Sequence, residues 1–442
     1  MRKWWIVLAS LTAAILVLTG GLLAAVSLSG EEPVVARPTP TSDPVRTPLF
    51  TPPAAPVGTP TEAGLRAALA RALAVPALGG RVSLSVVDVE TGQPLLEVDA
   101  TRQVVPASTA KIVTAIAALQ VLPADLRLTT KVLDAGGGDV VLVGGGDPTL
   151  LAPGMTSRYP KAARLADLAA QLTRGRHVVR RVLVDDRLFV GPRLGPGWKP
   201  SYVTSADVAP VSALELSGRE PADPALDTGR QLAKLLRVTT VARGTAPSGA
   251  PELGSVSSAP VPDLVESMLA TSDNDLAEAL GRHVALASGQ PASFDGVAAA
   301  FTQALQPLVQ AAGIDPAAFA LRDASGLSTA DRLQTGAMAR LLAHAARDQR
   351  FAALLSALPV AGFDGTLANR FRSGAATPGA GQVRAKTGSL TGVSALAGFV
   401  RTRAGRLLAF DITADGLPAG GPGGAPAALD VVASVLATCT CR

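Results

Sequence analysis

The spacing of apolar residues changes along the chain and predicts a different kind of structure in each stretch. Residues 62–78 repeat with a helical period, and residues 81–98 alternate on both sides of a Glu-Thr-Gly-Gln turn, which predicts a β-hairpin. The run from Ile112 to Leu122 is apolar at most positions. It predicts a helix that is buried on most sides and has Ser108 and Lys111 in its first turns.

The middle of the chain, residues 127–258, has short β-like runs separated by glycine-rich turns. The runs are residues 129–133, 139–143, 178–184 and 238–241. The segment Gly144-Gly145-Gly146 lacks the Lys-Ser/Thr pair that would follow in a phosphate-binding loop, so we interpret it as a turn. We expect this stretch to form an inserted, β-rich subdomain.

From Pro260 onward the pattern becomes mainly helical and then returns to strands. The expected helices are residues 261–270, 276–286, 294–312, 335–355 and 426–437, and the expected strands are residues 382–386, 394–402 and 406–413. Helices between an N-terminal hairpin and C-terminal strands indicate one mixed sheet built from both ends of the chain. The pattern predicts an α/β (α+β) fold in which residues 62–126 and 259–442 form one discontinuous domain.

The N-terminus has a pattern of its own. Arg2 and Lys3 precede residues 4–30, which contain no charged residue and exceed the roughly 20 apolar residues that cross a bilayer. The two basic residues are expected to stay in the cytoplasm, so that the rest of the chain is exported. We expect residues 1–30 to be a membrane anchor, with a cleaved signal peptide as the alternative, and the Pro- and Thr-rich residues 31–61 to be a semi-rigid linker.

Composition and charge narrow the classes of function. The net charge of +5 is small for 442 residues, and no block of Lys and Arg is interleaved with aromatic residues, so nucleic-acid binding is not supported and an ordinary solvated surface is expected. Cys439 and Cys441 have no further Cys or nearby His with which to close a zinc site, although they could form a tight disulfide in an exported protein. His177, His283 and His344 are scattered, so neither a metal nor another cofactor is expected.

Ser108 and Lys111 are the first candidates for chemistry. Residues three apart on a helix share one face, so the serine hydroxyl and the lysine amine become neighbours. The helix N-terminus adds free backbone N–H groups and the positive end of the helix dipole. A lysine that burial keeps neutral can take the serine proton and turn the hydroxyl into a nucleophile. Taken alone, a capping serine beside an unrelated lysine would give the same spacing.

Two further segments follow this pair along the chain. Ser272-Asp273-Asn274 lies between two expected helices, and Lys386-Thr387-Gly388 lies at the end of an expected strand. Ser-x-x-Lys, Ser-Asp-Asn and Lys-Thr-Gly are the motifs of penicillin-binding proteins and class A β-lactamases. The chain resembles the penicillin-binding serine peptidases. Within them it is most similar to the low-molecular-mass class C branch, the D-alanyl-D-alanine carboxypeptidases/endopeptidases of peptidase family S13.

The long insertion and four short segments carry the resemblance to that branch. The segments are residues 146–150 (Gly-Asp-Pro-Thr-Leu), 210–214, 323–328 and 364–367. The resemblance covers roughly residues 62–442, and Ala324 stands where the family commonly has glycine. It implies a penicillin-binding/serine β-lactamase-like transpeptidase fold, with a mixed antiparallel sheet flanked by helices and a β-rich subdomain inserted at residues 127–258.

The resemblance also implies a role for each motif residue. Ser108 would attack the carbonyl between two D-alanines and form an acyl-enzyme. Lys111, kept neutral by burial and by nearby Lys386, would accept its proton. Ser272 would relay a proton to the leaving D-alanine, and Asn274 would hold the peptide amide.

The terminal carboxylate of the substrate would bind at the Lys-Thr-Gly segment. The expected substrate-binding residues there are Lys386, Thr387, Gly388 and Ser389. The backbone N–H groups of Ser108 and Ser389 would form the oxyanion hole. The implied partners are peptidoglycan stem peptides ending in D-Ala-D-Ala, and β-lactam antibiotics as covalent inhibitors. The implied location is the cell envelope outside the cytoplasm.

Two other functions stay open at this point. A class A β-lactamase needs a glutamate base, and this chain has no glutamate after Glu278, although other lactamase classes use other bases. A protein that keeps the penicillin-binding fold and binds the cell wall without turnover would be free to lose Ser108, Lys111 or Lys386. All three are present.

Overall fold

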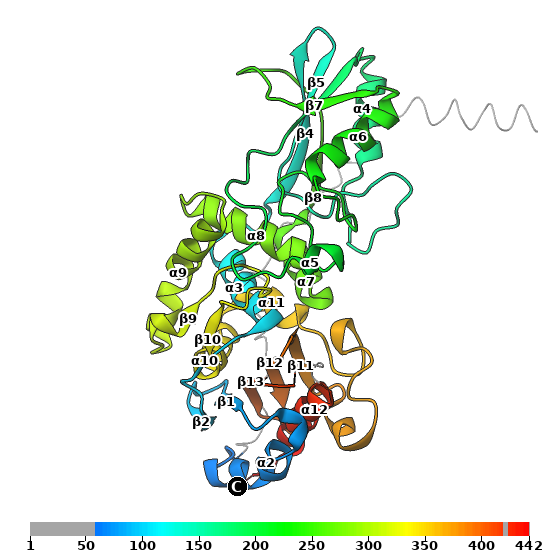
Figure 1. Cartoon of the computed structure of the whole chain (residues 1–442). Helices are drawn as coiled ribbons and strands as arrows, with labels where there is room; N and C mark the ends of the chain where they lie inside the picture. The colour runs from blue at the N-terminus through cyan, green and yellow to red at the C-terminus, as the bar shows by residue number, and fades with distance from the viewer. Residues whose placement is uncertain (1–57, 419–422, 442) are drawn as a thin grey trace, which may run out of the picture. The chain divides into compact units, whose positions relative to one another are not determined.

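The computed structural model describes residues 58–418 and 423–441 (Figure 1). The expected anchor at residues 1–30 and most of the expected linker lie outside the described residues. Within the described ranges, no helix combines the length and the apolar character that a bilayer crossing requires.

The main sheet has five strands in the order β11-β12-β13-β1-β2, and every neighbouring pair is antiparallel. The strands are β1 (Val82–Asp88), β2 (Pro94–Val98), β11 (Val383–Leu390), β12 (Val393–Arg401) and β13 (Leu407–Asp415). Val82 of β1 lies opposite Ala414 of β13, so strands from the two ends of the chain are direct neighbours. The prediction of one sheet built from both ends is confirmed.

Helices cover both faces of this sheet. On one face α2 (Glu62–Leu73) and α12 (Ala425–Thr438) pack together, and Leu84 of β1 belongs to their shared apolar core. On the other face lies α10 (Thr335–Ala345), whose Thr335 hydroxyl is 2.6 Å from the Ser83 hydroxyl. Successive strand residues point to opposite faces, which is why Ser83 and Leu84 meet different helices.

A second group of helices surrounds α3 (Lys111–Val121), which α7 (Val261–Thr271), α8 (Asn274–Ala287) and α9 (Phe294–Ala311) all contact. Residues 111–118 of α3 are all buried, as the apolar run predicts. A 3₁₀ turn, η2 (Ala107–Ala110), leads into α3 and packs against β11 and β12. Ser108 therefore lies in a 3₁₀ turn just before the α-helix and not in its first turns, which corrects the sequence-based expectation.

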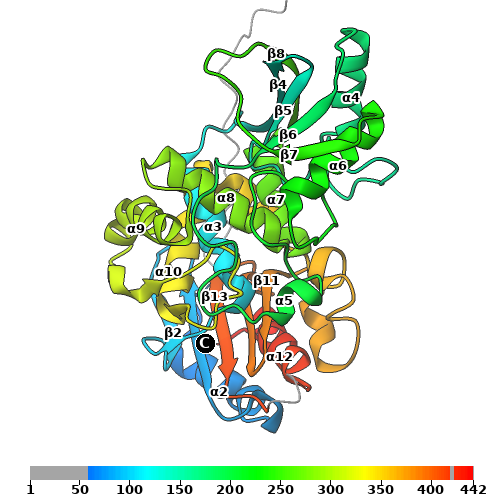
Figure 2. The same cartoon turned by 45° about the horizontal axis from the view of Figure 1, so that its top comes forward.

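Residues 127–260 form a second sheet, which Figure 2 shows. It has five strands and its own apolar core. Its strand order is β7-β6-β5-β4-β8, with β4 (Arg127–Gly136), β5 (Asp139–Val143), β6 (Arg181–Asp185), β7 (Thr240–Arg243) and β8 (Glu252–Pro260). The β5, β6 and β7 strands are parallel, whereas β4 is antiparallel to both of its neighbours. Helices α4 (Leu165–Arg174) and α6 (Pro224–Leu236) pack against this sheet.

Several of these elements differ from the sequence-based expectation. Helices α4 and α6 and strand β8 were not predicted, although Asp223 as N-cap and Pro224 at the first helical position are signals for a helix start. The helix expected at residues 335–355 ends at Ala345. There the Asp348 carboxylate accepts a hydrogen bond from the Arg350 backbone, which starts a separate 3₁₀ turn and competes with the continuing helix.

The remaining elements are short. They are β3 (Gln103–Val104), β9 (Phe319–Ala320), β10 (Arg332–Gln334), α5 (Ser201–Thr204), α11 (Ala352–Ala357), η1 (Pro76–Leu78), η3 (Pro316–Ala318), η4 (Gln349–Phe351), η5 (Gly365–Leu367) and η6 (Gly374–Gly379). Cys439 and Cys441 are joined as a disulfide just after α12, and the Cys441 carbonyl accepts a hydrogen bond from the Thr61 backbone at 2.8 Å. This bond ties the end of the described chain to the start of α2.

Candidate active site

Lys111 connects the first two motifs. Its Nζ atom donates to Ser108 Oγ at 3.1 Å, to Asn274 Oδ1 at 2.6 Å and to the Ser325 carbonyl at 2.6 Å. Lys111 is fully buried, whereas Ser108 is partly exposed. Burial lowers the pKa of Lys111 to about 8, although nearby carboxylates, Asp323 first among them, oppose the shift. A lysine in this setting can give up its proton and act as a base toward the neighbouring hydroxyl.

Ser272 and Asn274 lie on either side of the gap between α7 and α8. Ser272 ends α7 in the left-handed region with φ of 61°, a conformation that a serine adopts only where the surrounding structure enforces it. Asp273 caps α8, because its Oδ1 atom accepts from the Leu276 backbone N–H at 2.9 Å. The strained serine and the capped helix start together fix the directions of the Ser272 and Asn274 side chains.

Lys386 joins the third motif to the second. It is fully buried on β11, and its Nζ atom donates to Ser272 Oγ at 2.8 Å and to the Thr387 carbonyl at 2.9 Å. Burial, and then the charge of Lys111, hold the pKa of Lys386 well below its usual value. The Thr387 hydroxyl donates to the Thr366 hydroxyl at 3.0 Å.

The β11 strand passes directly beside the turn that carries Ser108. A Cβ atom at Gly388 would lie 2.7 Å from the Pro106 carbonyl oxygen, so the close approach of the strand requires glycine. Ser389, the next residue, is exposed to solvent. The structure thus brings Ser108, Lys111, Ser272, Asn274 and Lys386 together in one cluster. Within it, Lys111 is hydrogen-bonded to Ser108 and Asn274, and Lys386 is hydrogen-bonded to Ser272. Thr387, Gly388 and Ser389 run along the edge of the cluster.

Ser325 was not predicted as a site residue, but its carbonyl group belongs to this cluster. Glu278 holds the backbone at Ser325 in place, because its Oε1 atom accepts hydrogen bonds from the Ala324 and Ser325 backbone N–H groups at 3.0 and 2.9 Å. Its Oε2 atom forms a buried ion pair with Arg282 at 2.9 Å. Residues 323–328 and 364–367 stood out as motifs in the sequence, and that was the available signal for Ser325 and Thr366.

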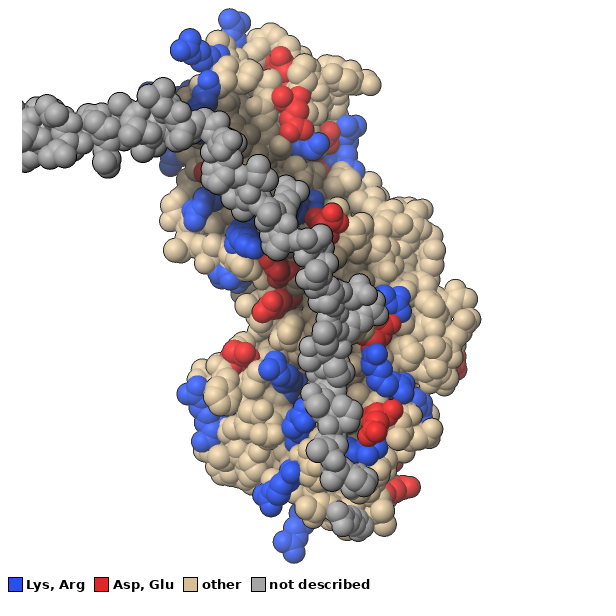
Figure 3. Space-filling model, turned by 180° about the vertical axis from the view of Figure 1, so that it is seen from behind, with Lys and Arg blue, Asp and Glu red and all other residues tan. Residues whose placement is uncertain are grey.

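Charges outside the cluster are mixed in sign. Figure 3 shows Lys and Arg side chains interspersed with Asp and Glu side chains on the face it presents, outside the grey atoms. This is the expected pattern of a solvated surface. Among residues 58–418 and 423–441, no group of three or more His, Cys, Asp or Glu residues is placed to hold a metal ion.

We expect Gly326→Ala to destabilise the protein more than an ordinary glycine replacement. Gly326 has φ of 78°, and a Cβ atom there would lie 2.0 Å from the Ala107 carbonyl oxygen, next to Ser108. The left-handed backbone alone costs about 1–3 kcal/mol, and the clash adds to it. Gly289→Ala is the matched control, since Gly289 has φ of 71° and open space around it. Equal changes in melting temperature for the two variants would contradict the expected clash.

A central antiparallel sheet with a serine turn packed against its edge strand, beside an all-helical layer, defines the class of the protein. The solved structure of penicillin binding protein 4 (dacB) from Haemophilus influenzae matches it with a TM-score of 0.66. The match covers 76% of this chain and 91% of that chain at 23% sequence identity. The predicted penicillin-binding/serine β-lactamase-like fold is confirmed.

The chain belongs to the D-Ala-D-Ala carboxypeptidase 3 (S13) family, which matches residues 65–220 and 217–436. It is 41% identical over 399 residues to carboxypeptidase Rv3627c of Mycobacterium tuberculosis, covering 86% of this chain and 84% of that protein. It is 40% identical over 399 residues to carboxypeptidase DacB of Mycolicibacterium smegmatis, covering 86% and 85%. The prediction that the protein is a D-Ala-D-Ala carboxypeptidase is confirmed.

Proposed function

We propose that the protein removes the terminal D-alanine from peptidoglycan stem peptides through an acyl-enzyme on Ser108, and that the same site cleaves cross-links as an endopeptidase. One observation carries the proposal. A buried lysine amine with a lowered pKa lies 3.1 Å from the hydroxyl of a partly exposed serine. This is the geometry that an activated nucleophile requires.

In the acylation step Ser108 Oγ attacks the carbonyl carbon of the penultimate D-alanine while its proton passes to Lys111 Nζ. The carbon–nitrogen bond of the peptide breaks, and the proton that Lys111 accepted passes through the Ser272 hydroxyl to the leaving amine, so that Lys111 is neutral again. Lys386 holds that hydroxyl at 2.8 Å. Water then attacks the ester carbonyl, the bond to Ser108 Oγ breaks, and a proton from the water restores the serine hydroxyl. A free D-alanine leaves in the carboxypeptidase reaction, and a neighbouring stem peptide leaves in the endopeptidase reaction.

Binding of the substrate is assigned to the residues along the edge of the cluster. Asn274 would accept or donate at the peptide amide, and the hydroxyl groups of Thr387 and Ser389 would bind the terminal carboxylate, with Lys386 and Gly388 beside them. The backbone N–H groups of Ser108 and Ser389 would form the oxyanion hole, where each donor contributes about 10²–10³ in rate. β-Lactams would acylate Ser108 in the same way as the substrate.

The proposal extends to the organisation and location of the chain. Residues 62–126 and 259–442 would be the peptidase domain, and residues 127–258 an inserted subdomain with its own sheet and core. Residues 1–30 would anchor the protein to the plasma membrane, or be cleaved, and residues 31–61 would be the linker that holds the peptidase domain near the peptidoglycan. The family's activity on D-Ala-D-Ala supports a location outside the cytoplasm.

A β-lactamase is the alternative that the site geometry disfavours. Both carboxylate oxygens of Glu278 are occupied by the Ala324 and Ser325 backbone and by Arg282. No glutamate follows it in the sequence to serve as a base for the acyl-enzyme. We therefore expect the acyl-enzyme that penicillin forms on Ser108 to be hydrolysed slowly.

The intact mass of the protein after incubation with benzylpenicillin tests the proposal. A stable adduct of one drug molecule is expected in the wild-type protein and is expected to be absent in Ser108→Ala. Release of D-alanine from a stem pentapeptide should be lost in the same variant. Opened penicillin without a stable adduct would show a β-lactamase instead. A folded protein with neither product would be a wall-binding protein without turnover.

A further inference from the structure

The inserted subdomain contacts the Ser272–Asn274 loop at the carboxylate of its central residue. Arg158 Nη2 donates to Asp273 Oδ2 at 2.8 Å, and the Tyr159 hydroxyl donates to the same oxygen. Arg158 Nε also donates to the Tyr159 hydroxyl at 2.9 Å. Tyr159 is 5% exposed, and its single polar atom is directed at Asp273. The other oxygen of Asp273 caps α8, so the carboxylate is held between the insert and the helix that begins at Asn274.

The insert also holds the two residues that follow Asp273. Asn274 Nδ2 donates to the Asp207 carbonyl at 2.7 Å, and the Ala209 backbone N–H donates to Asp275 Oδ1 at 2.8 Å. Three consecutive residues at the start of α8 are thus bound by atoms of the insert.

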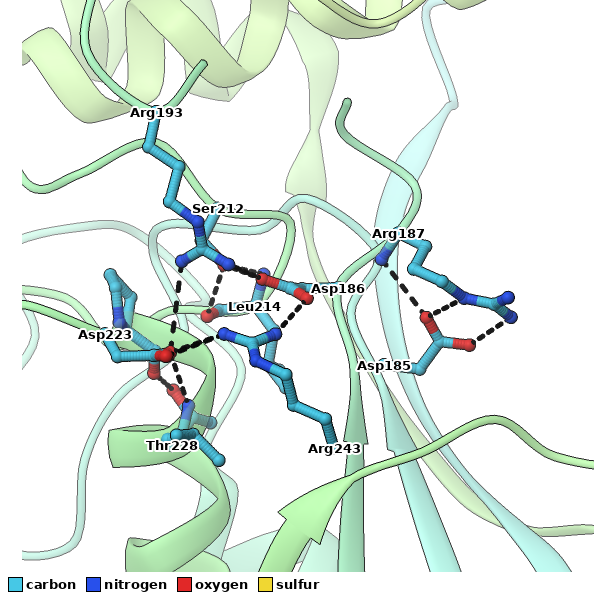
Figure 4. Close-up of polar contacts among 11 residues, drawn as sticks. Asp185, Asp186, Arg187, Arg193, Ser212, Leu214, Asp223, Thr228 and Arg243 are labelled. Carbon is cyan, nitrogen blue, oxygen red and sulfur yellow. Dashed lines mark hydrogen bonds and ion pairs between the residues drawn. The ribbon is translucent and has the colours of Figure 1, made fainter. Parts of the chain in front are cut away.

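The segment that contains Asp207 and Ala209 is itself anchored to the second sheet (Figure 4). Ser212 Oγ donates a hydrogen bond to Asp186 Oδ2 at 3.1 Å. Asp186 directly follows the last residue of β6. Asp186 also pairs with Arg193 and with Arg243 of β7, each at 2.6 Å. The 207–212 segment is therefore tied at its Ser212 end to a partly buried ionic network of the insert.

The electrostatics of the Asp273 contact favour a fixed geometry. Burial, and then the negative charge of Asp273, raise the pKa of Tyr159, so its hydroxyl remains a donor at all physiological pH values. A carboxylate that accepts from both a tyrosine and an arginine makes strong, charge-assisted hydrogen bonds. Asp273 cannot rotate without losing either these bonds or the cap of α8, and Ser272 and Asn274 are its direct neighbours.

We propose that Tyr159 and Arg158 are positioning residues for the Ser272–Asn274 loop, so that the inserted subdomain is part of the catalytic apparatus. This inference rests on the proposed function, because it assigns the two residues to the acylation step. They act through Asp273 and do not touch the substrate. Their loss is expected to slow the chemical step and to leave the binding of the ligand nearly unchanged.

Tyr159→Phe is the most direct test, since it keeps the buried ring and removes only the hydroxyl. The rate constant for acylation of the full-length protein by benzylpenicillin is expected to fall about ten- to a hundredfold, because small misplacements of catalytic groups have effects of this size. The dissociation constant of the initial complex should stay within about threefold, since the same contacts to the drug remain. Arg158→Ala should lower the rate constant in the same direction by a smaller factor.

Two variants of the insert serve as matched controls. Thr228→Val removes a buried hydroxyl that donates to the Pro224 carbonyl at 2.9 Å within α6. Arg219→Ala removes an arginine whose Nε atom is 2.7 Å from the Asp227 carboxylate, also within the insert. Each control loses one interaction of the same kind as the test variants, and neither residue has a hydrogen bond or an ion pair to α8. Both are expected to acylate at the wild-type rate.

A double-mutant cycle separates positioning from a general structural role. If Tyr159 acts through Asp273, Tyr159→Phe should slow acylation no further in an Asp273→Asn background. Equal slowing in both backgrounds, with a lowered melting temperature, would mean that Tyr159 only stabilises the fold, and the inference would be wrong. An unchanged rate of acylation in both Tyr159→Phe and Arg158→Ala would also overturn the inference. If Tyr159→Phe does not fold, the rate of acylation of Arg158→Ala decides between the two outcomes.

The wild-type protein and Ser108→Ala, run in the same assay, distinguish this inference from the proposed function. A wild-type protein that forms no adduct would overturn both. If the wild-type protein is acylated at Ser108 and the test variants are acylated at the same rate, only the positioning role is overturned.

Discussion

Lys111→Met is expected to lower the rate constant for acylation of Ser108 by about a thousandfold or more. Methionine fills the same buried volume but cannot accept the serine proton, and a positioned general base contributes about 10²–10⁴ in rate. The loss also removes the hydrogen bonds of Lys111 to Asn274 and to the Ser325 carbonyl, which adds to the effect. The time course of adduct formation with benzylpenicillin, followed by intact mass, measures this result.

Lys234→Met is the matched control for that variant. Lys234 lies on α6 and is exposed, so the same substitution there removes a lysine without touching the cluster. The control should be acylated at the wild-type rate. If the Lys111→Met variant retains more than about a tenth of the wild-type rate constant, Lys111 is not the base.

The same role for Lys111 predicts how acylation of the wild-type protein depends on pH. Burial disfavours the charged amine, so the pKa of Lys111 is lowered to about 8 and the neutral base is available at lower pH than in a free lysine. The rate constant should rise about tenfold per pH unit below that pKa and level off above it. The titratable groups that act on Lys111 are the carboxyl groups of Asp323, Asp273, Glu278 and Asp275. Lys386 lies beside them, and burial and the charge of Lys111 lower its own pKa. A rate constant that is flat between pH 6 and pH 9 would contradict the assignment.

Ser272→Gly is expected to give the second large effect, a fall of about a hundredfold or more in kcat for D-alanine release from a stem pentapeptide. The substitution removes the hydroxyl that would carry the proton to the leaving amine. Glycine relieves the backbone strain, because Ser272 has φ of 61° and glycine adopts this region freely. Ser272→Ala would lose the same hydroxyl but keep the backbone strain of a residue with a Cβ atom, so it should be less stable than Ser272→Gly.

Thr271→Ala provides the control for the loss of a hydroxyl at this loop. Its hydroxyl donates to the Ser267 carbonyl at 2.8 Å within α7, and the residue is exposed. Wild-type kcat is expected for the control. A Ser272→Gly enzyme that turns over the pentapeptide at the wild-type rate would show that the leaving amine obtains its proton from another group.

The local features of this protein were accessible from its sequence. The apolar run after Lys111 predicted a buried helix, and the 3-residue spacing placed the amine beside the Ser108 hydroxyl, as the structure has it. Alternation at residues 81–98 predicted the hairpin formed by β1 and β2, and the strands near the C-terminus completed the sheet. These features depend on residues within a few positions of one another, where periodicity fixes which side chains share a face.

The order of the three motifs also indicated the family to which the chain belongs. The sequence did not reveal how the motifs meet. Lys386 binds Ser272 across 114 positions of the chain, and Lys111 binds Asn274 across 163. Nothing in the local pattern specifies either contact, because each depends on how β11 and α8 pack around α3.

By itself the sequence determined the apolar faces, the strands from both ends and the identity of the reactive groups. Only the tertiary structure decided that Ser108 lies in a 3₁₀ turn, that the Ser325 carbonyl holds Lys111, and that Tyr159 of the insert reaches Asp273. The physical reason is the range of the interactions. Hydrophobic periodicity is set by near neighbours, whereas a buried hydrogen bond between distant segments exists only where the folded chain brings its donor and acceptor together.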